Sequence, residues 1–327
     1  MVEPVDQLHF AHVGCGAWGS NLVRELAAHP GVSLDLVIDA DARARERART
    51  LASGVSTASS MEALGDRPFD AVVIASPGPL HARHAMAAMA LGAHVFVEKP
   101  MTTSVVDARA MLARCRSRRR IGMVGHLLHH HAAVRMMLQL VAEGRIGTPL
   151  AFRSARLCQR SSRDADGSLL WSLAPHDMSV LRALDRGPVR KMRVDLRCLG
   201  EADSLPNVAD LRLRLAGGLE AHIVVSRAHR TKVRRMEVIG EDATVVFDDV
   251  APSSKLTLRW RGEVEDIPYR EGVSPLRAEV DAFVTSVRSG TRPEIGFVEG
   301  LEVVELLERA HAVASRTSDS PALSAAR

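Results

Sequence analysis

The feature that most constrains the fold is a glycine-rich turn between a short apolar segment and an amphipathic segment near the N-terminus. Residues 8–13 have the pattern of a buried strand, and apolar side chains recur at helical spacing after residue 17. Between them, Gly14, Gly16 and Gly19 form the pattern G-x-G-x-x-G. In this order of strand, turn and helix, the first glycine permits a tight turn, the second admits a pyrophosphate and the third lets helix and strand pack closely. The segment predicts a dinucleotide-binding unit.

An aspartate at the end of the next apolar segment supports this prediction. The segment LDLVIDAD contains Asp39, 20 residues after Gly19, about the spacing at which an acid binds the ribose hydroxyls of NAD. Asp41 is placed to cap the arginine-rich helix that follows. Arg43 and Arg45 lie close enough to offer a site for a 2′-phosphate, which leaves NADP open. Because an acid at position 39 would repel that phosphate, the sequence favours NAD.

Strand and helix patterns alternate over residues 1–125. Buried strands are predicted at FDAVVIAS, AHVFVEKP and IGMVGHLL, with helices at PLHARHAMAAMALG and SVVDARAMLARCRSRR. This alternation predicts an α/β fold with a doubly wound parallel sheet, which binds ligands outside the carboxyl ends of its strands. Beyond the glycine turn and Asp39, those ends are occupied by Ser76, Pro77, Glu98, Lys99, Gly125 and His126.

Composition argues against several other functions. Aromatic residues make up 3% of the chain, too few for base stacking to be a main activity. The net charge is +4 and the one dense basic cluster, at 116–120, is typical of a solvated helix end, so no nucleic-acid partner is expected. No apolar run reaches the roughly 20 residues that cross a bilayer, so no membrane association is expected either.

The cysteines and histidines predict no metal site. The four cysteines form no C-x-x-C pair and match no zinc spacing, which indicates free thiols in a reducing compartment. The segment GHLLHHHAAV is rich in histidine, but its consecutive histidines point in different directions and lack carboxylates at ligand spacing. The first ten residues do not have the pattern of a signal peptide. We expect a cytoplasmic protein.

Four segments resemble the Gfo/Idh/MocA oxidoreductases, the family of glucose–fructose oxidoreductase and inositol dehydrogenase. They are VGCGAWGSNLVREL, VVIASPGPLHARHAMAAMALGAHVFVEKPMT, LAPHDMSVL and GFVEGLEVVELLERAHAVASRT. The Glu-Lys-Pro sequence at 98–100 is the most specific, and WSLAPHD is most similar to a subgroup acting on nucleotide-linked amino sugars and their uronates. The resemblance implies hydride transfer between NAD(P) and a secondary alcohol or ketone of a sugar, sugar nucleotide or cyclitol.

The resemblance also implies the domain organisation. A Rossmann domain at 1–125 would precede an α+β domain at 126–327, built on an open, mostly antiparallel sheet for substrate binding and oligomerisation, with a C-terminal helix able to pack back on the first domain. The segment ADLRLRLAGGLEAHIVVS agrees, because charged and apolar residues alternate about Gly217 and Gly218, a hairpin signal. Since the far face of this sheet is often a subunit contact in the family, a homodimer or homotetramer is implied.

Lys99 and His176 match the family's catalytic residues. The family's lysine contacts the reacting hydroxyl and the nicotinamide ribose, and an ammonium at Lys99 would polarise a carbonyl or stabilise an alkoxide. His176 matches the general acid–base, a task that suits imidazole because its pKa lies near neutrality. We expect Pro175 to be the first helical residue and Asp177 to be a supporting acid in the first turn.

Ser172 departs from the family pattern, which usually has an aspartate four residues before the histidine. On a continuous helix Ser172 and His176 share a face, and the missing carboxylate would cost about 1–3 kcal/mol if the pair were buried. Three interpretations stay open. The enzyme is slower, or Asp164 or Asp166 replaces the carboxylate, or the reaction is a reduction that needs less base strength.

The resemblance implies further contacts. Cofactor contacts beyond those already named are expected at Ala17, Trp18 and His81; for His81 the alternative is that it only starts its helix. Substrate contacts are expected at His126 and His131. From the residues themselves, Arg156 is a further candidate, as one of four arginines that fit either an anionic substrate or a flexible basic loop: Arg153, Arg156, Arg160 and Arg163. Two other functions stay open: a nucleotide-binding relative without net redox turnover, acting as a sensor or partner subunit, and an epimerase or lyase that recycles tightly bound NAD.

Overall fold

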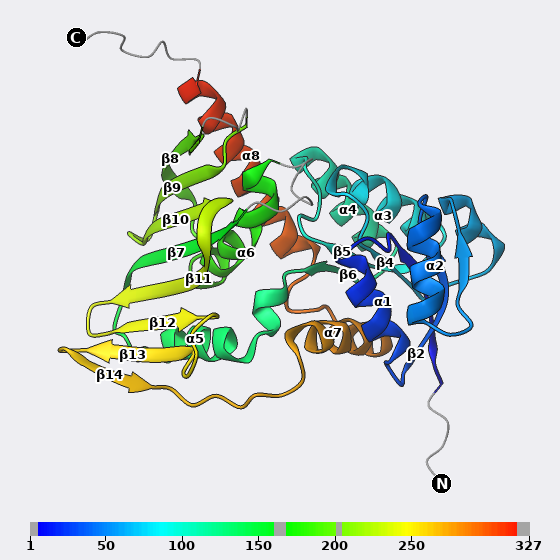
Figure 1. The fold of residues 1–327 in the computed structure, drawn as a ribbon, viewed down its shortest axis with the longest axis horizontal. Coiled ribbons are helices and arrows are strands. Elements are labelled where there is room, and N and C mark those ends of the chain that lie inside the picture. The colour runs from blue at the N-terminus through cyan, green and yellow to red at the C-terminus, as the bar shows by residue number, and fades with distance from the viewer. Residues whose placement is uncertain (1–5, 160–167, 201–204, 319–327) are drawn as a thin grey trace. The chain divides into compact units, whose positions relative to one another are not determined.

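The computed structural model describes residues 6–159, 168–200 and 205–318 (Figure 1). The chain forms two compact units, residues 1–130 with 273–304 and residues 131–272 with 305–327. The first unit therefore includes a segment from near the C-terminus in addition to the residues 1–125 assigned to it from sequence.

The first unit is built on a six-stranded sheet in which all paired strands are parallel. The strand order is β3-β2-β1-β4-β5-β6, so the strand order reverses between β1 and β4, the position at which doubly wound folds bind ligands. The strands are β1 (Leu8–Val13), β2 (Val32–Ile38), β3 (Ser56–Ala58), β4 (Ala71–Ile74), β5 (His94–Glu98) and β6 (Gly122–Gly125). The helices are α1 (Gly19–Ala27), α2 (Ala42–Leu51), α3 (His81–Ala90), α4 (Val105–Ser117) and α7 (Pro275–Ser289), with short 3-10 turns η1 (Met61–Asp66), η2 (Gly78–Leu80) and η3 (Leu127–His130). The predicted α/β fold is confirmed.

Helix α7 packs into the core of the first unit although it lies late in the sequence. Its Phe283 ring makes edge-to-face contacts with Phe10 of β1 and Phe96 of β5, at centroid distances of 5.8 and 5.7 Å. Ser274 caps the helix by accepting a hydrogen bond from the Arg277 backbone N–H. The helix ends at Gly290, whose left-handed backbone (φ 69°) favours glycine.

The second unit is built on an eight-stranded sheet of order β14-β13-β12-β11-β7-β10-β9-β8. Only the β7–β10 pair among its neighbours is parallel, which confirms a mostly antiparallel sheet, and the hairpin predicted about Gly217 and Gly218 joins β9 to β10. The strands are β7 (Pro149–Gln159), β8 (Val189–Arg197), β9 (Val208–Leu215), β10 (Glu220–Ser226), β11 (Ala228–Gly240), β12 (Thr244–Asp248), β13 (Leu256–Trp260) and β14 (Glu263–Asp266). The helices are α5 (Ala132–Ala142), α6 (Leu169–Leu184) and the last part of α8 (Phe297–Ser318).

No described helix combines the length and the apolarity that a membrane span requires. The four cysteines are free thiols, as predicted. Within the described ranges, no group of three or more His, Cys, Asp and Glu side chains is arranged to hold a metal ion.

Candidate active site

The three glycines of the first turn have different tasks. A Cβ on Gly14 (φ 94°) would lie 2.7 Å from the Ala75 carbonyl carbon, and a Cβ on Gly19 would lie 1.9 Å from the Gly14 oxygen. Neither position has room for a side chain. A Cβ on Gly16, in contrast, would meet no described atom within 4 Å. The turn thus packs tightly at its two ends and leaves open space beside Gly16 and the exposed Ala17, where a pyrophosphate fits.

A buried histidine supports this turn from behind. The Nε2 atom of His12 lies 3.0 Å from the Gly14 oxygen, and burial lowers the pKa of His12 to about 4. His12 is therefore neutral at physiological pH, with Nε2–H donating to the carbonyl. This role of His12 was not predicted from the sequence, although a histidine inside an apolar strand was a visible signal.

The Asp39 carboxylate joins the end of β2 to the glycine turn. One oxygen accepts a hydrogen bond from the Cys15 backbone N–H at 2.7 Å, and the other accepts one from the Asp41 N–H at 2.9 Å. The side chain is only partly buried, so lone pairs remain for ribose hydroxyls. The Arg45 guanidinium donates hydrogen bonds to the backbone carbonyls of Asp39 and Ala40. Of the two arginines considered for a 2′-phosphate site, Arg43 and Arg45, the second therefore already has backbone partners. These residues fit NAD.

Glu98, Lys99 and Trp18 are linked at the end of β5. The buried Glu98 carboxyl accepts hydrogen bonds from Trp18 Nε1 at 2.5 Å and from the Lys99 backbone N–H at 3.1 Å. Burial raises the pKa of Glu98, while the Trp18 hydrogen bond and the Lys99 charge act in the opposite direction. A Cβ on Gly125 would lie 3.1 Å from the Glu98 carboxyl carbon, so β6 needs a glycine there. The Trp18 ring is 42% exposed at this edge.

His81 connects two strand ends. Its Nε2 lies 2.6 Å from the backbone carbonyl oxygen of Ser76, after β4, and its Nδ1 lies 2.8 Å from the backbone carbonyl oxygen of Pro100, after β5. Burial lowers the pKa of His81, and the two carbonyls oppose that shift. Because both nitrogens face backbone oxygens and the ring is buried, His81 braces the two strand ends; the direct cofactor contact expected from sequence stays a prediction. The Ser76 hydroxyl, in turn, lies 2.9 Å from His84 Nδ1.

Two more buried titratable groups belong to the first unit. His126 is buried with both ring nitrogens lacking a hydrogen bond to any described residue, and burial, helped by the Lys99 charge, lowers its pKa to about 3. Glu279 of α7 is equally buried, and burial together with the Glu98 charge raises its pKa well above the ordinary value. Unsatisfied buried polar atoms such as those of His126 are costly unless a ligand group pairs with them, which fits a binding site beside Lys99.

In the second unit, α6 begins six residues earlier than expected. It spans Leu169–Leu184, so Pro175 lies inside the helix and Asp177 is not in its first turn. The prediction that Pro175 starts the helix is wrong, and with it the suggested contact between Asp177 and the N-terminal dipole. Proline is favoured at a first helical position, but burial of Leu169 and Leu170 in the core outweighs the one backbone hydrogen bond lost at Pro175.

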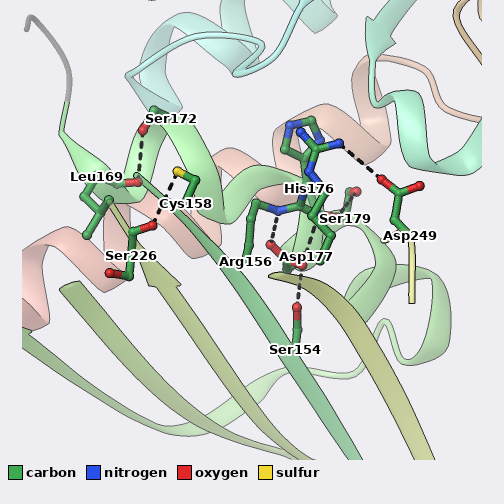
Figure 2. Close-up of polar contacts among 11 residues, drawn as sticks. Ser154, Arg156, Cys158, Leu169, Ser172, His176, Asp177, Ser179, Ser226 and Asp249 are labelled. Carbon is green, nitrogen blue, oxygen red and sulfur yellow. Dashed lines mark hydrogen bonds and ion pairs between the residues drawn. The ribbon is translucent and has the colours of Figure 1, made fainter. Parts of the chain in front are cut away.

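Asp177 instead holds a buried ion pair (Figure 2). One carboxylate oxygen accepts from Arg156 Nε at 2.9 Å, and the other accepts from the Ser154 hydroxyl at 2.5 Å and from Arg156 Nη2 at 3.3 Å. Asp177 and Arg156 are 1% and 8% exposed. The pair fixes α6 to β7, so Arg156 supports the helix, and its guanidinium is not directed to a substrate by these contacts.

Ser172 and His176 lie one turn apart on α6 (Figure 2). The Ser172 hydroxyl donates to the Leu169 oxygen at 3.2 Å and accepts from Arg227 Nη2 at 2.5 Å. A cation thus contacts the position where the family usually has an aspartate. Arg227 was missed because no local pattern connects it with Ser172. The alternative acids Asp164 and Asp166 lie outside the described residues, as do Arg160 and Arg163.

His131 caps α5. Its Nδ1 accepts a hydrogen bond from the Ala133 N–H at 3.2 Å, and its Nε2 lies 3.7 Å from the Asp249 carboxylate. The ring packs edge-on against Phe247 at 5.0 Å. Burial lowers the pKa of His131, while Asp249 acts in the opposite direction. These contacts account for His131 structurally, and its predicted substrate contact stays a prediction.

Two family models match most of the chain. Residues 8–126 match the oxidoreductase family with an NAD-binding Rossmann fold, and residues 134–246 match the GFO/IDH/MocA C-terminal domain. The chain belongs to the GFO/IDH/MocA family of oxidoreductases. NAD is the cofactor of its first unit.

Relatives of known activity agree with this family assignment. Inositol 2-dehydrogenase 3 of Saccharopolyspora erythraea is 28% identical over 305 residues, which cover 85% of this chain and 84% of the relative. UDP-N-acetylglucosamine 3-dehydrogenase of Acidithiobacillus ferrooxidans is 27% identical over 228 residues, 67% of this chain and 70% of the relative. Its solved structure superposes with a TM-score of 0.84 over 95% of this chain and 98% of that chain, at 24% identity. The fold of the GFO/IDH/MocA family thus extends over nearly the whole chain.

Proposed function

We propose that the protein transfers a hydride between NAD and the carbon of a secondary alcohol or ketone in a sugar, sugar nucleotide or cyclitol. The observation that carries this proposal is the set of groups at the carboxyl edge of the parallel sheet: the open space at Gly16, the Asp39 carboxylate and the Glu98–Lys99 pair. The relatives named above act on inositol and on UDP-N-acetylglucosamine, which supports this substrate class. They are dehydrogenases, which favours net turnover over a role as a sensor.

The roles of the residues follow from their chemistry. Bound NAD supplies a nicotinamide ring that accepts or returns the hydride. In the oxidation, the substrate C–H bond breaks with loss of the hydride, and the hydroxyl proton passes to His176, which returns it in the reduction. The Lys99 ammonium stabilises negative charge on the substrate oxygen in both directions. Glu98 fixes the backbone at Lys99 by accepting its N–H.

The substrate contacts are assigned in the same way. We propose that His126, a buried neutral imidazole with no described hydrogen-bond partner, pairs with a substrate hydroxyl. Arg156 holds α6, the helix that carries His176, in place through Asp177. The homodimer or homotetramer implied by the family resemblance stays a prediction.

The test is a direct assay of the purified protein. Formation of NADH from NAD, or of NADPH from NADP, is measured in separate reactions with myo-inositol, UDP-N-acetylglucosamine or its uronate. Reduction of the corresponding ketones is measured with NADH. We expect turnover of at least one substrate with preference for NAD. Turnover of none of them in either direction would overturn the substrate class, and failure of NAD to bind in calorimetry would overturn the reaction.

A further inference from the structure

A hollow of about 230 Å³ lies on the first unit, where α4 ends and β6 begins. Because α4 leads from the end of β5 back to the start of the parallel strand β6, the hollow lies at the amino edge of the sheet. The glycine turn and Lys99 follow the carboxyl ends of the strands, at the opposite edge. The hollow is therefore separate from the candidate active site.

The floor of the hollow is apolar and well packed. Cys115 of α4, Ile121 before β6 and Phe297 at the start of α8 line it, and all three are buried. A Cβ on Gly122 would lie 2.6 Å from the Phe297 ring, so the ring packs closely against β6. Burial raises the pKa of the Cys115 thiol to about 11, and its Sγ donates to the Arg120 carbonyl at 2.7 Å. The thiol is therefore neutral, and the floor suits an apolar group.

The rim of the hollow is cationic. The charged side chains that line it are Arg116, Arg119, Arg120 and Arg292, with no carboxylate of the described residues among them. Arg292 pairs with Glu299, whereas the other three arginines form no ion pair with a carboxylate in the described part of the chain. Part of the basic cluster at 116–120 thus borders an apolar hollow with its charge unbalanced.

The backbone at Arg119 is strained. The Arg119 N–H donates to the Arg116 carbonyl at 3.1 Å and the Arg120 N–H to the Cys115 carbonyl at 3.0 Å, the two bonds that close a helix through a left-handed residue. Arg119 is that residue (φ 49°), where glycine is preferred because a Cβ is crowded. Arg118 already places a cation at the helix end, so the helix dipole does not explain an arginine at position 119. Strained residues concentrate at functional sites.

We propose that the hollow binds a small phosphate monoester that carries an apolar group. Guanidinium groups offer donors in pairs to phosphate oxygens, and the apolar floor takes the rest of the ligand. A volume of about 230 Å³ lies below the roughly 300–1,000 Å³ of sites for drug-sized ligands, so the ligand is small. The inference does not depend on the proposed function.

The test is a calorimetric titration of the full-length protein with phenyl phosphate at constant ionic strength. NAD is present at saturation so that the glycine turn is occupied. We expect saturable binding that is about tenfold tighter than the binding of inorganic phosphate, because only phenyl phosphate has a ring to place on the apolar floor.

Variants within the basic cluster separate a built site from diffuse charge. Arg116→Gln removes a cation of the rim, and the control Arg118→Gln removes an exposed cation that does not line the hollow. We expect phenyl phosphate binding to weaken about tenfold or more in the first, because a charge-assisted hydrogen bond is lost, and little change in the control. Arg119→Gly should weaken binding about tenfold as well, while its melting temperature stays at or above that of the wild type because glycine relieves the strained backbone.

Other outcomes would overturn the proposal. Absence of phenyl phosphate binding would remove the site, and binding no tighter than that of inorganic phosphate would remove the role of the apolar floor. Equal weakening in Arg116→Gln and Arg118→Gln would leave only diffuse surface charge. Binding to phosphatidylglycerol vesicles that Arg116→Gln abolishes, without binding of phenyl phosphate, would make this a membrane-facing surface.

Discussion

The two units stabilise buried carboxyl groups in different ways. In the second unit, Asp177 is 1% exposed and its charge is balanced by the Arg156 guanidinium and the Ser154 hydroxyl. In the first unit, Glu98 and Glu279 are similarly buried and their pKa values are raised by burial. A buried charge is retained where a cation lies opposite it, and elsewhere the carboxyl is favoured in its neutral form. The helix of His176 thus rests on a fixed ion pair, while Lys99 lies near groups whose charged forms are disfavoured by burial.

The largest effect is expected from breaking the ion pair in the second unit. Arg156→Ala leaves the Asp177 carboxylate buried without its cation, which costs about 3–5 kcal/mol of unfolding free energy. Urea denaturation followed by circular dichroism measures this loss. Arg153→Ala is the matched control, since Arg153 is exposed on the other face of β7, and its effect should stay within about 0.5 kcal/mol. Equal effects in the two variants would refute the role of the pair.

A second prediction concerns acid stability of the first unit. Burial lowers the pKa of His126 to about 3, so the unfolded chain binds a proton near pH 6.5 that the folded chain does not accept. Its contribution to stability is present above pH 6.5 and is lost as the pH falls toward 3. His126→Asn removes this pH dependence. When the pH is lowered from about 6.5 to about 4.5, the melting temperature of the variant should therefore fall less than that of the wild type. Identical slopes would show that His126 is not a neutral buried group.

A third prediction concerns Asp39, a carboxylate that is neither ion-paired nor fully buried. Asp39→Ser removes hydrogen bonds to ribose hydroxyls and the repulsion of a 2′-phosphate. The ratio of NAD to NADP affinity should fall by about tenfold, because one hydrogen bond to a charged group contributes about 1.5 kcal/mol to binding. Calorimetry with both cofactors measures the ratio. Asp41→Ser is the control, because Asp41 caps α2 and its replacement should leave the ratio unchanged; a shift in both variants would contradict the role of Asp39.

The smallest effect is expected from Glu279→Gln. The folded-state pKa of Glu279 is raised, so the folded chain binds a proton that the unfolded chain releases above about pH 4.5. Its stability contribution is therefore lost as the pH rises through the folded pKa. The glutamine variant does not titrate, so its stability does not fall in this way as the pH rises. At about pH 8 its melting temperature should be at least that of the wild type. Glu294→Gln, at an exposed position of the same unit, should change nothing. Marked destabilisation by Glu279→Gln would mean that Glu279 is charged and paired.

The site of the first unit could be predicted from sequence because its groups follow strands in the chain. Gly14, Asp39 and Lys99 each come directly after an apolar segment, and parallel topology brings those strand ends to one edge of the sheet. The braces between strand ends were less visible. The link from His81 to Pro100 joins residues 19 positions apart, and its ring contacts backbone atoms that no side-chain pattern reveals.

The second unit was harder to predict, because its contacts join residues that lie far apart in the chain. Arg227 and Ser172 are 55 residues apart, and Arg156 and Asp177 are 21 residues apart. The start of α6 was misplaced because Pro175 matches a common start signal, while the longer helix depends on packing of Leu169 and Leu170 in the core. Tertiary packing of apolar residues outweighed a local signal there.

The central claim is that Lys99 acts on the substrate oxygen in an NAD-dependent hydride transfer. The most direct test measures the turnover rate of Lys99→Met with saturating NAD and with the substrate that the assay identifies. We predict a loss of about 10²–10⁴-fold with NAD binding retained in calorimetry, whereas Lys232→Met, at an exposed lysine, should match the wild type. Turnover by Lys99→Met at the wild-type rate would contradict the account.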